Sequence, residues 1–518
     1  MIDAAKSPRG RVFFVSWFAL ATLSFLWSIA TPLSASPDEP AHLVKAASVV
    51  RGEFVGDQVS RGNEVRVPNY IAFTNSQACY ARQADVTADC IPRVPGDPWR
   101  TVNSITSAGL YNPVYYLLVG WPSLIFHDSS GVFAIRLVSG LVSSAFLALA
   151  LMIISTWRRR TLPTIAVAVA STPMIFFLMG SVNPNSLEIT ATLAAFVGTL
   201  SIILHPDRSL LTSRGTIVIV AASIGVNTRG LSPLWFAIAL FVPLLLASRI
   251  QLLELWKTKT VRVGMIVIGA ATIFALLWLR FAGDLATRGI PFGDAAEPYP
   301  FTGASSWIGF TRMMGLFFPQ VNDMVGVFGW LEVPAPIEVY MIWIVLIGGL
   351  LLWSVVLLRK RSLIVVIFLG AFFAFLPAIA QAAYITSGGY IWQGRYTLPL
   401  FVILIVGIGA VLAERLEGPQ PEFLRPLTRV VFVLWATGQV LTFANVLRRY
   451  VVGADKTWSQ FIRDPQWQPP GGTYLLLGLF VVAVGITAFI GARWALDRNV
   501  WPVRRPEAGR EERHLTRG

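Results

Sequence analysis

The stretch "GVFAIRLVSGLVSSAFLALALMIISTWRRR", residues 131–160, decides the class of fold. Only Arg136 interrupts a long uncharged segment, which ends on three consecutive arginines. A helix needs about 20 mainly apolar residues to cross the hydrocarbon core of a bilayer. Clustered Lys and Arg mark the cytoplasmic ends of such helices. Residues 131–156 therefore predict a transmembrane helix whose C-terminal end is cytoplasmic.

Comparable apolar stretches recur along the whole chain. The 518 residues are 55% hydrophobic and 14% charged, whereas soluble domains carry roughly 25% charged residues. We predict an all-α polytopic membrane protein with about twelve transmembrane helices. They are expected at residues 12–32, 131–156, 161–180, 186–204, 215–229, 231–248, 262–281, 337–358, 362–384, 397–413, 430–447 and 473–492.

The polar segments divide the chain into six parts. These are a cytoplasmic N-terminus with a retained first span (1–32), a first outer loop with juxtamembrane helices (33–130), spans two to seven (131–281), a second outer loop (282–336), spans eight to twelve (337–492) and a basic cytoplasmic tail (493–518). The apolar segment 111–126 is short and broken by Pro122, so it is expected at the interface. This threading places more than half of the 42 Lys and Arg residues in the cytoplasm.

The net charge of +14 does not indicate a nucleic-acid-binding protein, because the basic residues are dispersed between apolar segments. The sequence contains no Walker A pattern, zinc-binding HExxH or CxxC spacing, serine elbow or dinucleotide fingerprint. Cys79 and Cys90 lie in the first outer loop, where they form either a disulfide or two free thiols.

Charges concentrate unexpectedly in "SASPDEPAHLVKA", residues 34–46, directly after the first span. Asp38 is placed as the N-cap of an amphipathic helix that lies parallel to the membrane, with Pro40 in its first turn. Asp38, Glu39 and His42 can then face one spot at the membrane surface. In one interpretation Asp38 caps, Glu39 complements the helix dipole, and His42 and Lys45 are solvated.

In the other interpretation the cluster is catalytic. Asp38 would take the proton of an acceptor hydroxyl, and a divalent metal (Mg, Mn or Ca), if one is used, would be held by Glu39 and His42. No cofactor is indicated with certainty, and spacing alone does not choose between the two interpretations.

Two further outer turns carry candidate polar residues. In "GSVNPNSLEIT", Asn183 and Asn185 suit a turn or a helix cap. Glu188 lies just inside the membrane edge, where an acid is costly unless it is paired or lines a wet cavity. Arg229 either snorkels to lipid headgroups or clamps an anion.

The segment "TSGGYIWQGRYTLPL" precedes a later span. An aromatic belt accounts for its aromatic residues, but not for Gln393 and Arg395 beside Tyr396, which favour binding of an anion. Arg136 and Arg280 are expected to snorkel. The acids of the second outer loop are not ranked: Asp284, Asp294, Glu297, Asp323 and Glu332.

Four segments in this order resemble one bacterial family: "SPDEPAH", "YNPVYYLL", "SVNPNSLEI" and "QGRYTLPL". The family consists of largely uncharacterised predicted membrane proteins and is similar to the GT-C class of glycosyltransferases. The resemblance extends to about residue 410. It implies a GT-C-like bundle that transfers a sugar from a polyprenyl-phosphate carrier to an extracytoplasmic glycan or protein.

The resemblance also implies roles for individual residues. Asp38 matches the acidic residue that acts as base, and Glu39 matches a neighbour often shared with a divalent metal. Arg395 is the best match for a lipid-phosphate ligand, and Arg229 is a weaker one. Many relatives have an aspartate where this chain has Asn183 and Asn185, which leaves a second catalytic acid open unless Glu188 replaces it.

We therefore predict a glycosyltransferase of the bacterial plasma membrane, with both termini cytoplasmic and the site on the outer face. Two alternatives stay open: a flippase or transporter for lipid-linked glycans, which would need charges at mid-bilayer, and a non-catalytic membrane protein of envelope assembly.

Overall fold

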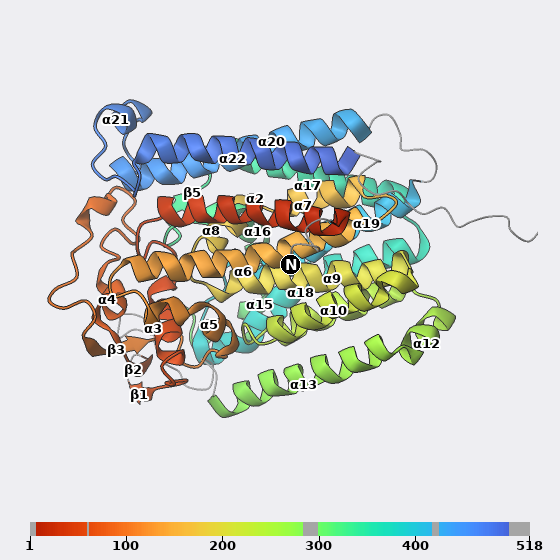
Figure 1. The fold of residues 1–518 in the computed structure, drawn as a ribbon, viewed down its shortest axis with the longest axis horizontal. Coiled ribbons are helices and arrows are strands. Elements are labelled where there is room, and N and C mark those ends of the chain that lie inside the picture. The colour runs from red at the N-terminus through yellow and green to blue at the C-terminus, as the bar shows by residue number, and fades with distance from the viewer. Residues whose placement is uncertain (1–6, 60–61, 283–298, 417–423, 497–518) are drawn as a thin grey trace, which may run out of the picture.

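The computed structural model describes residues 7–59, 62–282, 299–416 and 424–496 as a bundle of long helices with a small mixed cap at one end (Figure 1). The cap comes from the segments after the first helix and from α21. The helices are α2 (Pro8–Ala30), α3 (Glu39–Val49), α4 (Asn69–Ala72), α5 (Val114–Val119), α6 (Ser130–Ser155), α7 (Thr161–Ala170), α8 (Pro173–Met179), α9 (Pro184–Leu204), α10 (Arg208–Gly225), α11 (Ser232–Phe241), α12 (Arg249–Lys257), α13 (Lys259–Ala282), α15 (Ser306–Gly315), α16 (Phe317–Gly326), α17 (Ile337–Leu357), α18 (Lys360–Gly388), α19 (Leu398–Arg415), α20 (Leu424–Val452), α21 (Trp458–Arg463) and α22 (Thr473–Leu496).

Within these described ranges, nine helices are long and apolar enough to cross a membrane, or ten spans if the bent pair α7–α8 counts as one. The chain is thus an all-helical, multi-pass membrane protein. The sequence predicted about twelve spans, and two of these predicted spans are not among the candidate spans of the structure. The predicted spans 215–229 and 231–248 fall on α10 and on the short apolar helix Ser232–Leu246, and neither qualifies by both length and apolarity.

Two spans form the centre of the bundle. In the apolar stretches of α9 and of Gly394–Arg415, 89% and 94% of the residues are buried, whereas in that of α13 only 11% are buried. Helices α9 and α19 are apolar on all sides and enclosed by other helices, so they have little contact with lipid. Polar residues at the beginnings of α9 and α19 are therefore held inside the protein.

A break in the membrane-spanning part separates α7 from α8, which meet at 68°. Backbone groups freed by such a break need partners, because the bilayer core supplies none. The Ser171 carbonyl accepts from Trp435 Nε1 at 3.0 Å and from Gln439 Nε2 at 2.9 Å. Thr172 Oγ1 donates to the Met324 carbonyl at 2.7 Å. Groups of α20 and α16 therefore supply hydrogen-bond partners at the break.

The cap combines short helices with a three-stranded antiparallel sheet in the order β1 (Asp57–Val59), β2 (Gly62–Pro68), β3 (Thr101–Thr106). In the β2–β3 register, Val65 pairs with Ser104. A second small sheet pairs β4 (Val327–Phe328) with β5 (Val333–Pro334). Short 3₁₀ helices complete the described elements: η1 (Phe73–Ser76), η2 (Ala88–Cys90), η3 (Trp121–Leu124), η4 (Val242–Leu246) and η5 (Gly394–Thr397).

Helix α3 lies inside this cap, which corrects the prediction of an amphipathic surface helix. All of its residues except Ala41 are buried, including His42 and Lys45. The predicted solvation of these two side chains is therefore wrong. The apolar segment 111–126 forms the short helices α5 and η3. With six and four residues, neither is long enough to cross the membrane.

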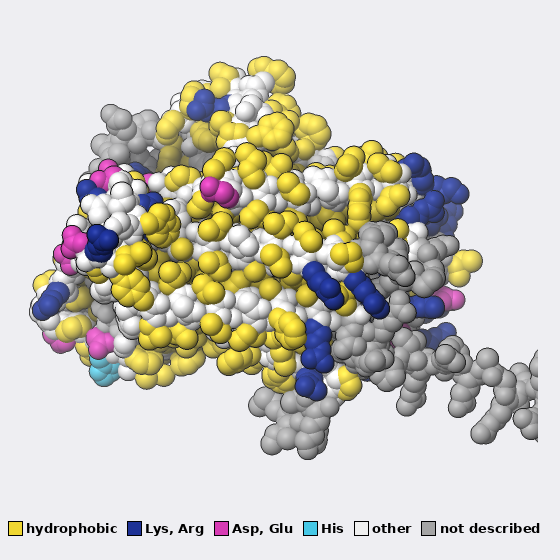
Figure 2. All heavy atoms as spheres, turned by 90° about the horizontal axis from the view of Figure 1, so that it is seen from above, with side chains coloured by type: hydrophobic (Ala, Val, Ile, Leu, Met, Phe, Trp, Pro, Cys, Tyr) yellow, Lys and Arg dark blue, Asp and Glu magenta, His cyan; other side chains and the backbone are white. Residues whose placement is uncertain are grey.

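The surface of the bundle divides along its length (Figure 2). Hydrophobic side chains cover most of the face in view, and Lys and Arg gather at the end opposite the cap, at the right of the view. The cap end mixes acidic, basic and His side chains. This pattern fits a bilayer around the middle of the bundle.

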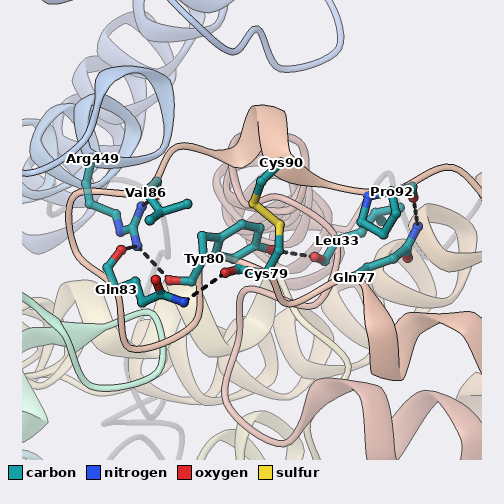
Figure 3. The surroundings of a disulfide bond; sticks show 9 residues. All are labelled: Leu33, Gln77, Cys79, Tyr80, Gln83, Val86, Cys90, Pro92 and Arg449. Carbon is teal, nitrogen blue, oxygen red and sulfur yellow. Dashed lines mark hydrogen bonds between the residues drawn. A yellow bond between two sulfur atoms is a disulfide. The ribbon is translucent and has the colours of Figure 1, made fainter.

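A disulfide bond cross-links one loop of the cap. Cys79 and Cys90 form a disulfide that closes a loop with a sequence separation of 11 (Figure 3). Arg449, at the end of α20, is 1% exposed and donates to the carbonyls of Tyr80, Gln83 and Val86 at 3.0, 2.8 and 2.6 Å. Tyr80 Oη donates to the Leu33 carbonyl. The loop therefore connects the end of α2 with the end of α20.

We expect both cysteines to be oxidised in the isolated protein, and thiol alkylation without a reductant to modify neither. Replacing the pair by Cys79→Ser/Cys90→Ser should lower the free energy of unfolding by about 2–3 kcal/mol, since a short cross-linked loop limits the unfolded chain. The check is mass spectrometry after alkylation, followed by thermal unfolding. Full labelling of the native-purified protein would contradict the pairing.

Candidate active site

An ion pair joins the first outer segment to a turn more than 350 residues later. Arg395 Nη2 contacts Asp38 Oδ2, and Arg395 Nη1 donates to the Pro37 carbonyl at 3.5 Å. The Arg395 side chain is 4% exposed, whereas 45% of the Asp38 side chain is open to water. The structure thus brings together the predicted acid and the predicted anion ligand, with the acid accessible to a molecule arriving from solution.

Asp38 occupies an unusual backbone conformation. Its φ of 64° lies in the left-handed region, and its side chain makes no capping hydrogen bond, so the predicted N-cap geometry is wrong. Asp tolerates this conformation better than most residues because its short polar side chain adds little steric conflict. The turn before it is held by Ser34, whose Oγ donates to the Thr74 carbonyl at 2.8 Å and whose carbonyl accepts from Trp330 Nε1 at 2.9 Å.

Two side chains and a glycine shape the turn that carries Arg395. Gln381 Nε2 donates to the Gly389 carbonyl at 2.9 Å, and its Oε1 accepts from the amide of Trp392 at 3.0 Å. A Cβ at Gly394 would lie 2.4 Å from Asp323 Cβ, so only glycine permits this approach of η5 to α16. Burial raises the pKa of Asp323 to about 6, although the Gly394 amide opposes the shift. Asp323, unranked by sequence, thus supports the turn.

Arg229 and Arg395 both lie close to the aromatic ring of Tyr396. The Arg229 guanidinium is 4.2 Å from the Tyr396 ring centroid, and that of Arg395 is 5.3 Å away. Glu188 is 1% exposed and accepts from Ser232 Oγ at 2.5 Å, while Ser232 Oγ also accepts from the Arg229 amide at 3.0 Å. The cluster therefore combines two guanidinium groups with the carboxylates of Asp38 and Glu188.

His42 faces Asp38 from the next turn of α3. Its Nδ1 lies 2.8 Å from Tyr116 Oη, and its ring meets that of Tyr111 edge-on at 5.5 Å. Burial, together with the positive charges of Arg229 and Arg395, lowers the pKa of His42 to about 3 despite Asp38. The imidazole is therefore neutral at physiological pH and acts as a hydrogen-bonding group rather than as a stored proton.

Partial burial acts to raise the pKa of Asp38, but the guanidinium groups of Arg395 and Arg229 outweigh it and hold this pKa below its usual value. The surface left open to water is consistent with this, because solvent limits the cost of the charge. Asp38 is thus ionised at physiological pH.

Glu39, predicted to act beside Asp38, points into the protein instead. Arg136 donates to it from Nε at 2.7 Å and from Nη2 at 2.5 Å, and both side chains are 0% exposed. Glu39 Oε1 also accepts from the Val182 amide at 3.0 Å. Arg136 also donates hydrogen bonds to the carbonyls of Ser28, Thr31 and Pro32 at 2.9, 2.7 and 2.9 Å. The prediction that Arg136 snorkels to the lipid headgroups is therefore wrong.

This geometry does not fit the expected metal ligands. Both Glu39 oxygens are used by Arg136, and His42 Nδ1 is used by Tyr116. The part of the chain that the structure describes contains no group of three or more His, Cys, Asp or Glu residues that could hold a metal ion. Glu39 and His42 are therefore not arranged as a pair of metal ligands.

The predicted amides line the same region. Asn183 caps α9 by accepting from the Asn185 amide at 3.0 Å, and its Nδ2 lies 3.5 Å from the Pro37 carbonyl. Both polar side-chain atoms of Asn185, which is 0% exposed, lack a hydrogen-bond partner among the described residues. Gln393 Oε1 also lacks a hydrogen-bond partner among the described residues.

Some candidates lie elsewhere, and others were missed. Asp284, Asp294 and Glu297 fall outside the described residues. Glu332 lies 3.4 Å from Arg449, at the disulfide loop rather than at Asp38. Tyr111, beside His42, was not predicted to belong to the site. Its segment "YNPVYYLL" was predicted to lie at the interface and was one of the four family segments, but no site role was predicted for Tyr111.

The chain was compared with known proteins. No curated protein matches it. Two crystal structures of ArnT from Cupriavidus metallidurans, one bound to undecaprenyl phosphate and one in the apo state, are similar at 13% sequence identity. The similarity covers 94% of this chain and 78% and 77% of theirs, with TM-scores of 0.46 and 0.43. Residues 22–404 match the family model described as predicted membrane protein DUF2142, and the chain therefore belongs to this family.

Proposed function

We propose that the protein is a membrane glycosyltransferase that moves a sugar from a polyprenyl-phosphate donor to an acceptor outside a bacterial plasma membrane. The single observation that carries this proposal is the contact of the water-accessible Asp38 carboxylate with the buried Arg395 guanidinium at one end of an apolar bundle. A lipid phosphate is an anion fixed at headgroup level, so its enzyme needs cations there and a base on the water side.

The distribution of charge supports an outward-facing site. Lys and Arg gather at the end of the bundle opposite the cap (Figure 2). Basic clusters remain on the cytoplasmic side of membrane proteins. Asp38 follows α2 on the side of the cap, so it would face the extracytoplasmic space (Figure 1).

The helix termini add to the anion-binding character. Helices α9 and α19 begin beside the site, at Pro184 and Leu398. A helix N-terminus carries a partial positive charge from its unpaired amides. Together with Arg229 and Arg395, these termini favour a phosphate in the same place.

The proposed reaction uses these groups directly. The acceptor hydroxyl oxygen attacks the anomeric carbon, a new glycosidic bond forms, and the bond from that carbon to the phosphate oxygen breaks. Asp38 takes the hydroxyl proton. Arg395 and Arg229 stabilise the charge that grows on the leaving lipid phosphate. His42, neutral and bonded to Tyr116, lies one helical turn after Asp38.

The proposal predicts that Arg395→Ala lowers the affinity for undecaprenyl phosphate by at least about tenfold, because a charge-assisted bidentate contact is lost. Binding to the purified protein in lipid nanodiscs is measured by native mass spectrometry. Arg100→Ala serves as the control, since Arg100 is an exposed residue of the cap. Equal binding by wild type and Arg395→Ala would remove Arg395 from the phosphate site.

A further inference from the structure

The resting site contains a conflict. Asp38 must take a proton, yet its contact with Arg395 stabilises the ionised carboxylate and makes it a weak base. Arg395 must bind phosphate, yet one of its donors already serves Asp38. Each group thus occupies the other in the state that the structure shows.

We propose that the donor phosphate displaces Asp38 from Arg395, so that the carboxylate becomes an effective base only when a donor is bound. This inference rests on the proposed function and adds an order to it: the acceptor is deprotonated only after the donor has arrived.

The hydrogen bonds of Arg395 leave room for such an exchange. Asp38 contacts only Nη2, and Nη1 reaches the Pro37 carbonyl at 3.5 Å. Nε is buried and has no acceptor among the described residues. Guanidinium groups bind phosphate best through two parallel N–H donors. A phosphate that takes Nε and Nη2 together would satisfy the unpaired donor and expel the Asp38 oxygen.

The Asp38 side chain has space to move while its backbone stays fixed. Nearly half of that side chain is open to water. The neighbouring Glu39 is fixed by its bidentate pair with the buried Arg136. Ser34 holds the preceding turn through Thr74 and Trp330. Release would therefore require a change of side-chain rotamer at Asp38 and no movement of α3.

The charge balance favours the exchange as well. The described cluster places the guanidinium groups of Arg229 and Arg395 near the carboxyl groups of Asp38 and Glu188. A bound phosphate places negative charge near the displaced carboxylate. Like charges raise the pKa of a carboxyl group, which makes Asp38 a stronger base at the moment when it is needed.

The test measures binding of undecaprenyl phosphate without any acceptor. Asp38→Asn removes the competing charge and keeps the left-handed turn, which Asn also tolerates. We expect this variant to bind the lipid about tenfold more tightly than wild type, the equivalent of a partly buried ion pair that no longer has to be broken. Asp57→Asn, a change of an exposed acid in the same cap, should leave the affinity unchanged.

A double-variant cycle separates displacement from simple repulsion. If Asp38 competes for Arg395, the gain from Asp38→Asn disappears when Arg395 is already alanine. If the carboxylate only repels the phosphate, the gain persists in that background, and the displacement proposal is overturned. Equal affinity of wild type and Asp38→Asn also overturns it while leaving the proposed function intact. Absence of binding in every variant would overturn both.

Discussion

Asp38→Asn should reduce sugar transfer by about 10²- to 10⁴-fold, the usual contribution of a general base. The amide preserves the size of the side chain and the left-handed turn, but it cannot accept the acceptor's proton. The amide oxygen can still accept a hydrogen bond from the buried Arg395, although Arg395 loses the counter-charge of Asp38. The measurement is release of polyprenyl phosphate from a labelled polyprenyl-phosphate sugar by the protein in nanodiscs.

The matched control is Asp57→Asn, which neutralises an exposed acid of β1 and should keep the wild-type rate. Thermal unfolding of Asp38→Asn should match that of wild type, so that loss of transfer reflects chemistry and not folding. Wild-type transfer by Asp38→Asn would exclude Asp38 as the base. Tighter lipid binding together with slower transfer is the combined result expected for this variant.

Glu39→Gln should have its main effect on stability. The change leaves Arg136 buried without a counter-charge, and breaking a buried ion pair costs about 3–5 kcal/mol. Arg136 also bonds the carbonyls of Ser28, Thr31 and Pro32, so the pair holds the end of α2 against α3. The measurement is the apparent melting temperature of the purified protein, together with its yield from the membrane.

Asp38→Asn is the natural comparison, since it alters the adjacent residue and breaks an ion pair that is partly open to water. A large fall in melting temperature for Glu39→Gln, but not for Asp38→Asn, supports a structural role for Glu39. A catalytic Glu39 would give the opposite pattern, with a normal melting temperature and lost transfer. Arg136→Lys should also destabilise, because an ammonium group cannot replace the two-point contact.

The sequence predicted the membrane class well, because long apolar stretches are a strong signal for transmembrane helices. It was less reliable for α10 and for the helix Ser232–Leu246. Apolar residues there reflect packing against α9 and α13 as much as contact with lipid, and the two cases look alike in a linear pattern. Burial of α3 was missed because the cap that covers it comes from distant segments.

The site was predictable only in part. Asp38 and Arg395 stood out as charges beside apolar spans, although their direct contact depends on the fold. The roles of Glu39 and Arg136 were missed because each residue has an ordinary local explanation, as a dipole partner and as a snorkelling cation. Their pairing across 97 positions has no local signal. The contact of Asp323 with Gly394 also joins separate segments, so the sequence contains no local signal for it either.

The most direct test is a cryo-EM map of the protein in nanodiscs with undecaprenyl phosphate. If the donor phosphate displaces Asp38, phosphate density will contact the guanidinium groups of Arg395 and Arg229, and the Asp38 side chain will be turned away from Arg395. Phosphate density at another place on the bundle, with the contact between Asp38 and Arg395 unchanged, would contradict it.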